Sequence, residues 1–313
     1  VSLMNKNKYT DPSYIPDKNT LSELESLNND KQDLSNSHLS GAQLENIHLV
    51  EAKIKKSNLS KANLKNASMF GADLRNSNLF KANLENANLN NSNLENCNLL
   101  GANLLNTKLK NINWGKDCKV INEIEAEKAY KNGDIETALE KYKEAEDIYR
   151  AIKISMQSQT LGDDAGTFFI REMTAKRKQF KKFSASRIGS KIIELTTGYG
   201  EKMGNIGFTI IGIILVCMVL YGIEGVSYGT LSDGETTRVV GFFDEVSMGD
   251  EYGFLNTLGN LFYFSVVVYS TVGFGEMLPI GPLGKSVMIF EGIAGGLVLA
   301  ILIIALYKKT MDR

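Results

Sequence analysis

A five-residue repeat near the N-terminus restricts the fold more than any other feature of the chain. From residue 37 to residue 116, sixteen units follow one another without a gap, as in AQLEN, ANLKN, ADLRN and ANLEN. The centre of each unit is leucine, or else Ile54, Met69 or Trp114, and a small residue usually stands two positions earlier. This period matches neither the turn of an α-helix nor the two-residue alternation of a strand.

A chain that turns a corner every five residues satisfies the repeat, because the central residue and the small residue then both point inward. Four units form one coil of about 20 residues, and stacked coils lie about 4.8 Å apart. Asparagines recur at this spacing in three sets, which predicts side-chain amide ladders between coils. The sets are Asn58, Asn78 and Asn98; Asn63, Asn83 and Asn103; and Asn66, Asn86 and Asn106.

These units resemble the pentapeptide-repeat family. The resemblance implies a right-handed quadrilateral β-helix over residues 37–116, and we expect the N-terminal segment, residues 1–36, to include a short helical cap. Some members of that family are acidic DNA mimics, but here residues 37–116 hold ten Lys or Arg against five Asp or Glu. Because the net charge of the whole chain is −1, we expect no nucleic-acid partner, and the ligand or protein partner of the repeat stays open.

The reactive side chains of the repeat form no recognisable site. Cys97 occupies a small inward position and is interpreted as part of the core, whereas His38 and His48 point outward on opposite faces and cannot share a metal ion. The three cysteines show neither metal nor disulfide spacing, so we expect no cofactor. Two outward apolar columns either contact another subunit or the following helices, or are ordinary exposed residues. They are Val50 with Phe70, and Phe80 with Leu100.

Residues 117–183 are expected to form a helical connector, with turns at Gly133 and at the sequence LGDDAG. Its alternation of Ala and Tyr resembles tetratricopeptide packing, and an antiparallel spacer is favoured over a peptide-binding site. The next segment, residues 184–204, is basic and places Ile188, Ile192 and Leu195 on one helix face. This pattern predicts a helix lying on the membrane surface beside anionic lipid head groups.

Two apolar segments are long enough to cross a bilayer as helices. Residues 206–223 carry no charge, and residues 286–307 carry only Glu291. We therefore predict two transmembrane helices at 206–223 and 284–307, within a pore domain of residues 205–313. Two buried helices of a soluble domain are the alternative, but only about 60 residues lie between them to cover such helices.

Two similar loops, TTGYGEK at 196–202 and TVGFGEM at 271–277, compete for the role of an ion filter. After an outer loop at 224–254, an apolar helix at 256–270 is too short to cross and runs directly into the second loop, between the two spans. This order resembles the two-transmembrane potassium channel pore. The first loop follows a basic stretch, so we interpret it as a glycine-rich bend.

The resemblance implies a homotetramer with a filter at residues 271–275, where backbone carbonyls of four chains bind K⁺. The filter residues are Thr271, Val272, Gly273, Phe274 and Gly275, the first four offering the K⁺-binding oxygens. Val272 and Phe274 are expected to pack behind the filter, and Phe274 lacks the hydroxyl that the tyrosine usual at this position provides. Glu276 stands where the family often has aspartate and is expected to support the filter.

Two further features of the second span are assigned functions. Glu291 is costly to place in lipid, so we expect it to face protein with a hydrogen-bond partner near the pore helix, rather than to bind ions directly. Gly292, Gly295 and Gly296 follow it, and we expect close packing at two of them and a gating hinge at one.

Charge placement predicts the orientation. The stretch before the first span is basic, and the chain ends with Lys308, Lys309 and Arg313, whereas residues 224–282 contain eight acidic residues and only Arg238 as a basic one. The positive-inside rule then places both termini in the cytosol, with the protein in the cytoplasmic membrane.

We therefore expect a membrane-embedded, potassium-selective channel that conducts passively and catalyses no reaction, with a regulatory or assembly role for the β-helix. A weakly selective cation channel and a membrane-tethered interaction scaffold with a vestigial pore are the alternatives.

Overall fold

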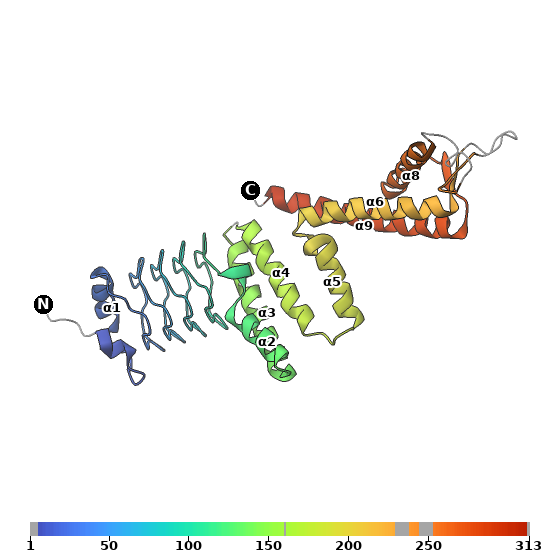
Figure 1. Cartoon of the computed structure of the whole chain (residues 1–313). Helices are drawn as coiled ribbons and strands as arrows, with labels where there is room; N and C mark the ends of the chain where they lie inside the picture. The colour runs from blue at the N-terminus through green and yellow to red at the C-terminus, as the bar shows by residue number, and fades with distance from the viewer. Residues whose placement is uncertain (1–5, 160, 229–237, 244–252, 312–313) are drawn as a thin grey trace. The chain divides into compact units, whose positions relative to one another are not determined.

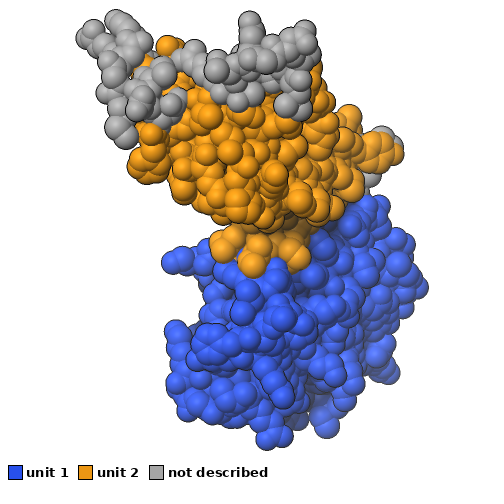
Figure 2. Space-filling view, turned by 90° about the vertical axis from the view of Figure 1, so that its right-hand side faces the viewer, with its two compact units in different colours: residues 1–191, 312–313 blue, residues 192–311 orange. Residues whose placement is uncertain are grey.

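The computed structural model describes residues 6–159, 161–228, 238–243 and 253–311. They divide into two compact units, one within residues 1–191 and one within residues 192–311, which Figure 2 shows in different colours. The first unit contains the repeat and the helices around it. The second contains both long apolar helices.

The repeat forms a parallel β-helix, which confirms the fold expected from the sequence (Figure 1). Single bridges join residues 20 positions apart, from Asp33 with Lys53 to Asn93 with Asn113. Backbone hydrogen bonds link each coil to the next, such as Leu44 N to Asn63 O at 2.8 Å. The ladder thus begins at Asp33, before the start at residue 37 that the sequence suggested.

The corners of the coils depend on the residue two positions after each central apolar residue. This residue has a positive φ in every unit from Asn36 to Asn111, and it is often Asn or Gly. Both residues tolerate the left-handed region better than others do, Gly because it has no Cβ and Asn because its side chain bonds locally. The backbone geometry therefore favours asparagine at this corner, although lysine or glutamate occupies it in four units, as at Lys56.

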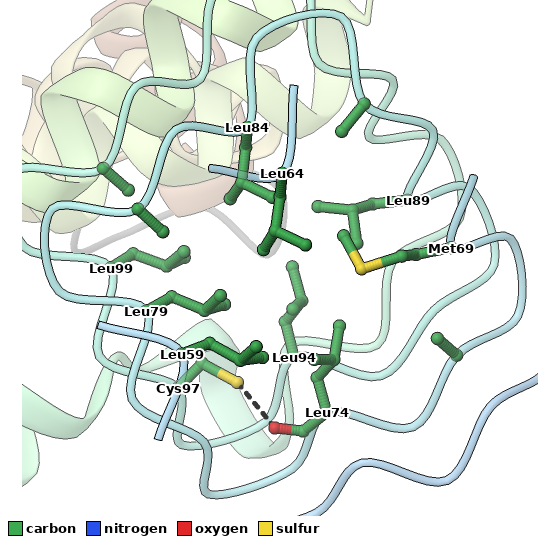
Figure 3. Packing of buried hydrophobic residues seen from close by; sticks show 14 of the residues in the cluster. Leu59, Leu64, Met69, Leu74, Leu79, Leu84, Leu89, Leu94, Cys97 and Leu99 are labelled. Carbon is green, nitrogen blue, oxygen red and sulfur yellow. Dashed lines mark hydrogen bonds between the residues drawn. The ribbon is translucent and has the colours of Figure 1, made fainter. Parts of the chain in front are cut away.

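The inward positions form a tightly filled core (Figure 3). Central residues of successive coils stack in columns, such as Leu59, Leu79 and Leu99, and each of these is almost fully buried. Cys97 lies among them and donates its Sγ–H to the Leu74 carbonyl at 3.0 Å. This placement agrees with its interpretation as a core residue.

Two of the three asparagine sets form side-chain ladders. Asn103 donates to Asn83 at 3.0 Å and Asn83 to Asn63 at 3.3 Å, and Asn86 donates to Asn66 at 3.2 Å. In the third set the amide oxygens accept local backbone bonds instead, such as Ser60 N to Asn58 Oδ1 at 3.1 Å. A side chain at this position therefore also stabilises its own corner, an alternative that spacing alone does not reveal.

Both ends of the β-helix are covered. At the first coil, helix α1 (Thr20–Asn29) buries Leu24 and Leu27, and the Glu25 carboxylate accepts from His48 N at 2.8 Å. At the last coil, Ser155 Oγ donates to Leu104 O at 2.9 Å, and Leu109 N donates to Gln159 Oε1 at 3.1 Å. Groups that would face the next coil therefore bond to helices instead.

The connector is more than the spacer suggested by its sequence. It contains α2 (Ile121–Lys131), α3 (Ile135–Gln157) and α4 (Gly162–Lys178), followed by α5 (Ala185–Thr197). Its buried side chains join those of the β-helix in one cluster, and Phe168 of α4 meets Trp114 of the last repeat edge-on, with ring centroids 5.0 Å apart. Residues 6–178 therefore share one core.

The core position of Cys97 predicts an unreactive thiol. Burial raises the pKa of Cys97 to about 12 and also shields its sulfur from reagents. With iodoacetamide at pH 8, we expect Cys118, which is partly exposed, to be alkylated first, and Cys97 only in denaturant. Peptide mass spectrometry measures both sites, and equal labelling of the two in the folded protein would contradict this packing.

The second unit is built from α6 (Met203–Glu224), α8 (Gly253–Tyr269) and α9 (Pro282–Met311). In Figure 1, α6 and α9 run side by side and α8 lies against them near one end. The expectation of an all-α domain is wrong, since β1 (Val226–Tyr228), β2 (Arg238–Val240) and β3 (Met277–Pro279) form an antiparallel sheet in the order β2-β1-β3. These strands are too short for their sequence pattern to stand out.

Candidate ion-conduction site

Two helices within the described residues are long and apolar enough to cross a membrane, α6 and α9. Between them, α8 has 17 residues and a length of about 26 Å at 1.5 Å per residue. Its apolar sequence ends at Tyr269, and the segment 271–275 begins two residues later. The chain therefore enters this segment from the end of a helix that is shorter than α6, with 22 residues, and α9, with 30 residues.

The sign of φ alternates along the segment. Thr271, Gly273 and Gly275 have φ values of 56°, 54° and 78°, whereas Val272 and Phe274 are not among the residues with positive φ. Alternation of this kind turns successive peptide groups toward the same side of the backbone, so that neighbouring carbonyls can face one point. The two glycines adopt these angles without steric cost.

Thr271 is the unusual member, because β-branched residues rarely adopt positive φ. It follows the last turn of α8, and its N–H donates to the Val268 carbonyl at 3.0 Å. This bond is typical of the residue that ends a helix in the left-handed conformation. The end of α8 therefore fixes the angle at which the segment begins.

The side chains of the segment find little cover within one chain. Val272 is 55% exposed and Phe274 is 67% exposed. The packing behind the filter that the sequence predicted for them is therefore not supplied by the same chain.

Glu276 is held from α8, which the sequence did not reveal. The Tyr263 hydroxyl of α8 donates to Glu276 Oε1. Tyr263 of α8 thus provides a hydroxyl group beside the segment, whereas Phe274 within the segment has none. The sequence gives only a weak hint, because Tyr263 is one of two tyrosines in a mostly apolar helix.

Glu291 lies at the meeting point of the three helices and is fully buried. Tyr221 of α6 donates to its Oε2 at 2.7 Å, and the Ser265 hydroxyl of α8 lies 2.5 Å from its Oε1. Ser265 also donates to the Ile214 carbonyl at 2.9 Å. The carboxyl group of Glu291 therefore connects α9 to both α6 and α8, and each of its two oxygens has a protein partner.

The three glycines of α9 differ in their surroundings. A Cβ on Gly295 would lie 2.3 Å from the Tyr269 carbonyl oxygen, so close packing against the end of α8 requires glycine there. At Gly292 and Gly296 a Cβ would meet nothing within 4 Å in this chain. Close packing in one chain thus accounts for one of the three, and α9 runs through all of them without a break.

The acidic outer loop lies mostly outside the described residues. Of its acidic side chains, the structure describes Glu224. Glu224 accepts a bond from Gly284 N at 2.8 Å, in the first turn of α9. A carboxylate there compensates the positive end of the helix dipole.

Comparison with known families agrees with this division of the chain. Residues 234–311 match the family described as ion channel, and residues 33–113 match pentapeptide repeats in overlapping segments with eight copies. The chain joins a pentapeptide-repeat domain to an ion-channel domain. No curated protein matches its sequence.

Solved structures similar to this chain are pentapeptide-repeat proteins. One from the cyanobacterium Cyanothece 51142 is 44% identical over 26% of this chain and 56% of its own, with a TM-score of 0.26. HetL of Nostoc sp. strain PCC 7120, involved in heterocyst differentiation regulation, is 33% identical over 26% and 38%, with a TM-score of 0.25. A further Nostoc protein is 33% identical over 30% and 77%, with a TM-score of 0.28. The chain therefore covers between a third and three fifths of the first two.

Proposed function

We propose that the protein is a homotetrameric, potassium-selective channel that conducts K⁺ passively through the segment 271–275. The observation that carries this proposal is the alternation of φ along residues 271–275. This segment directly follows α8, a helix that lies between the two spans in the sequence and is shorter than either. Backbone carbonyls aimed at one axis replace the water around a dehydrated K⁺. One segment offers too few oxygens for this, so four chains must contribute.

The exposed side chains are consistent with assembly. The side chains of Val272 and Phe274 are solvent-exposed within one chain, and neighbouring subunits around a pore would bury them. Lys308 and Lys309 in the last turn of α9 and the basic residues before α6 support cytosolic termini in the cytoplasmic membrane. Under this proposal the β-helix lies in the cytosol and has a regulatory or assembly role.

The test uses the purified full chain in liposomes under opposed K⁺ and Na⁺ gradients. A reversal potential close to that of K⁺, with block by barium, supports the proposal. A reversal potential near zero would instead favour a weakly selective cation channel. No flux under any condition would contradict conduction and favour a membrane-tethered scaffold.

Removal of the cytosolic part must respect the shared core. Deleting residues 1–116 would expose Phe168, which packs against Trp114. A variant that starts after α4 avoids this damage, because the whole of the shared core leaves together. Comparing its open probability with that of the full chain tests the regulatory role, and identical values under every condition would contradict it.

We also propose that α5 lies on the membrane surface beside anionic lipids. Ile188, Ile192 and Leu195 are each at least half exposed and share one face, and only a short turn separates α5 from the start of α6 at Met203. Lys181 and Lys182 precede the helix and are exposed. Apolar residues beside such charges suit the boundary between head groups and acyl chains.

This surface predicts which side of α5 contacts lipid. Trp114 is the only tryptophan, so Trp114→Phe provides a background for a new tryptophan at Ile192 or, as a control about 120° around the helix, at the exposed Ser186. In vesicles of brominated phosphatidylglycerol we expect strong fluorescence quenching at position 192 and weak quenching at position 186. Equal quenching at both positions would contradict the proposed face.

A further inference from the structure

The loop that resembles the filter, at the end of α5, has an unusual backbone. Gly198, Tyr199 and Gly200 have successive φ values of 56°, 57° and 83°. Left-handed residues normally occur singly, because each costs a residue with a Cβ about 1–2 kcal/mol. Gly198 and Gly200 adopt these angles without that cost, so the strain falls on Tyr199, which keeps this conformation only where its surroundings hold it.

Side chains of α6 hold the end of α5 that leads into this turn. Asn205 Nδ2 donates to the Leu195 carbonyl at 3.2 Å, and Thr209 Oγ1 donates to the Thr196 carbonyl at 2.6 Å. These bonds satisfy carbonyls that the last turn of α5 leaves free. The last turn of α5 and the first two turns of α6 are therefore tied together.

The turn delivers Glu201 to the far end of α9. The Glu201 carboxylate accepts from Lys308 Nζ, 107 residues later in the sequence. Its side chain is only 14% exposed. Next to it, Ile206 of α6 packs with Val298 and Ala305 of α9 in one buried cluster. The ion pair thus lies beside an apolar contact that joins the same two helices.

Lys308 is well placed to control the inner end of α9. It stands three residues before the end of the helix at Met311. Gly292 and Gly296, farther back along the helix, have open space around them. A bend at either glycine would displace this end, and the ion pair opposes that displacement because Glu201 is fixed to α5 and α6.

We propose that Glu201 is a positioning residue for gating, and that its ion pair with Lys308 holds the inner end of α9 in the closed position of the pore. This rests on the proposed function. Movement of α5 reaches α9 through the turn at 198–200, which gives the loop that resembles the filter a role in opening.

The first experiment measures open probability in single-channel recordings of the full chain. Glu201→Gln and Lys308→Gln are each expected to raise open probability at least about five-fold, the effect of a coupling near the lower end of the usual range. The charge swap E201K/K308E is expected to restore the wild-type value. Lys309→Gln, which removes the same charge one residue later, is the control and is expected to have no effect.

A role confined to folding would lower the melting temperature and the number of channels but leave the open probability of each folded channel unchanged, whereas the proposal expects the open probability itself to rise. Open probability that stays constant or falls in the single variants would overturn the proposal. So would a swap that fails to restore the wild-type value.

The second experiment does not depend on conduction. In a variant with the three native cysteines replaced by alanine, the pair E201C/K308C is expected to be cross-linked within one chain by a short bis-maleimide, because the two replaced side chains meet at their ends and a direct disulfide would need Cα atoms within about 7 Å. Failure of this cross-link to form in a conducting channel would overturn the inference. A cross-link in a protein that conducts nothing would leave the placement of the pair intact but exclude a role in gating, and the proposed function would fail with it.

Discussion

Replacing Gly273 by alanine is expected to reduce K⁺ flux by at least about ten-fold. The φ of 54° at this position is one that residues with a Cβ adopt only at a cost of about 1–2 kcal/mol. A cost of about 1.4 kcal/mol changes a population ten-fold, and it arises in every subunit of the pore. The added methyl group meets nothing within 4 Å in this chain, so the effect comes from the backbone conformation.

Flux of K⁺ into liposomes measures this effect, and elution volume on size exclusion checks that the variant still assembles. Gly259→Ala is the matched control. Gly259 is also exposed with open space around it but lies inside helix α8, where alanine is more favourable than glycine by about 1 kcal/mol. A Gly273→Ala channel that conducts like the wild type would show that the conformation of this residue does not matter for conduction.

Replacing Glu291 by alanine is expected to lower the melting temperature of the detergent-purified protein by several degrees. The substitution removes the carboxyl partner of the Tyr221 hydroxyl and leaves Ser265 with the Ile214 carbonyl alone. A buried polar group that loses its partner costs about 1–3 kcal/mol. The loss falls on the contact between α6, α8 and α9, so the pore domain should unfold first.

Glu291→Gln is the informative companion, because the amide has nearly the same shape and can both donate and accept hydrogen bonds. We expect it to melt within a few degrees of the wild type and to conduct. If the glutamine variant were stable but did not conduct, the carboxyl group would have a direct role with ions. If the alanine variant melted with the wild type, the three-helix junction would not depend on this residue.

The repeat could be predicted from the sequence because its fold depends on a local rule applied sixteen times. Each inward leucine and each corner asparagine repeats the same information, so errors at single units do not matter. The two spans were also predictable, since length and the absence of charge suffice. The order of a first span, a shorter apolar helix and a glycine-containing segment then pointed to residues 271–275.

The contacts that hold the candidate site could not be predicted in the same way. Tyr263 with Glu276, Tyr221 with Glu291, and Glu201 with Lys308 are single pairs that form between separate elements. No sequence periodicity predicts these pairs. In a single sequence, a tyrosine in an apolar helix is compatible with many different contacts. The docking of α3 and α4 on the last coil was missed for a related reason, because their buried faces are also those of an ordinary helical hairpin.

The covered ends of the β-helix have a consequence for solubility. A stack of parallel coils presents unpaired N–H and C=O groups at its first and last rung, and such edges recruit further strands from other molecules. Here Glu25 of α1 occupies one edge, and Ser155 and Gln159 of α3 and its following turn occupy the other. These helices cap both ends of the β-helix. The caps prevent the repetitive, self-complementary coils of different molecules from polymerising end to end into fibres.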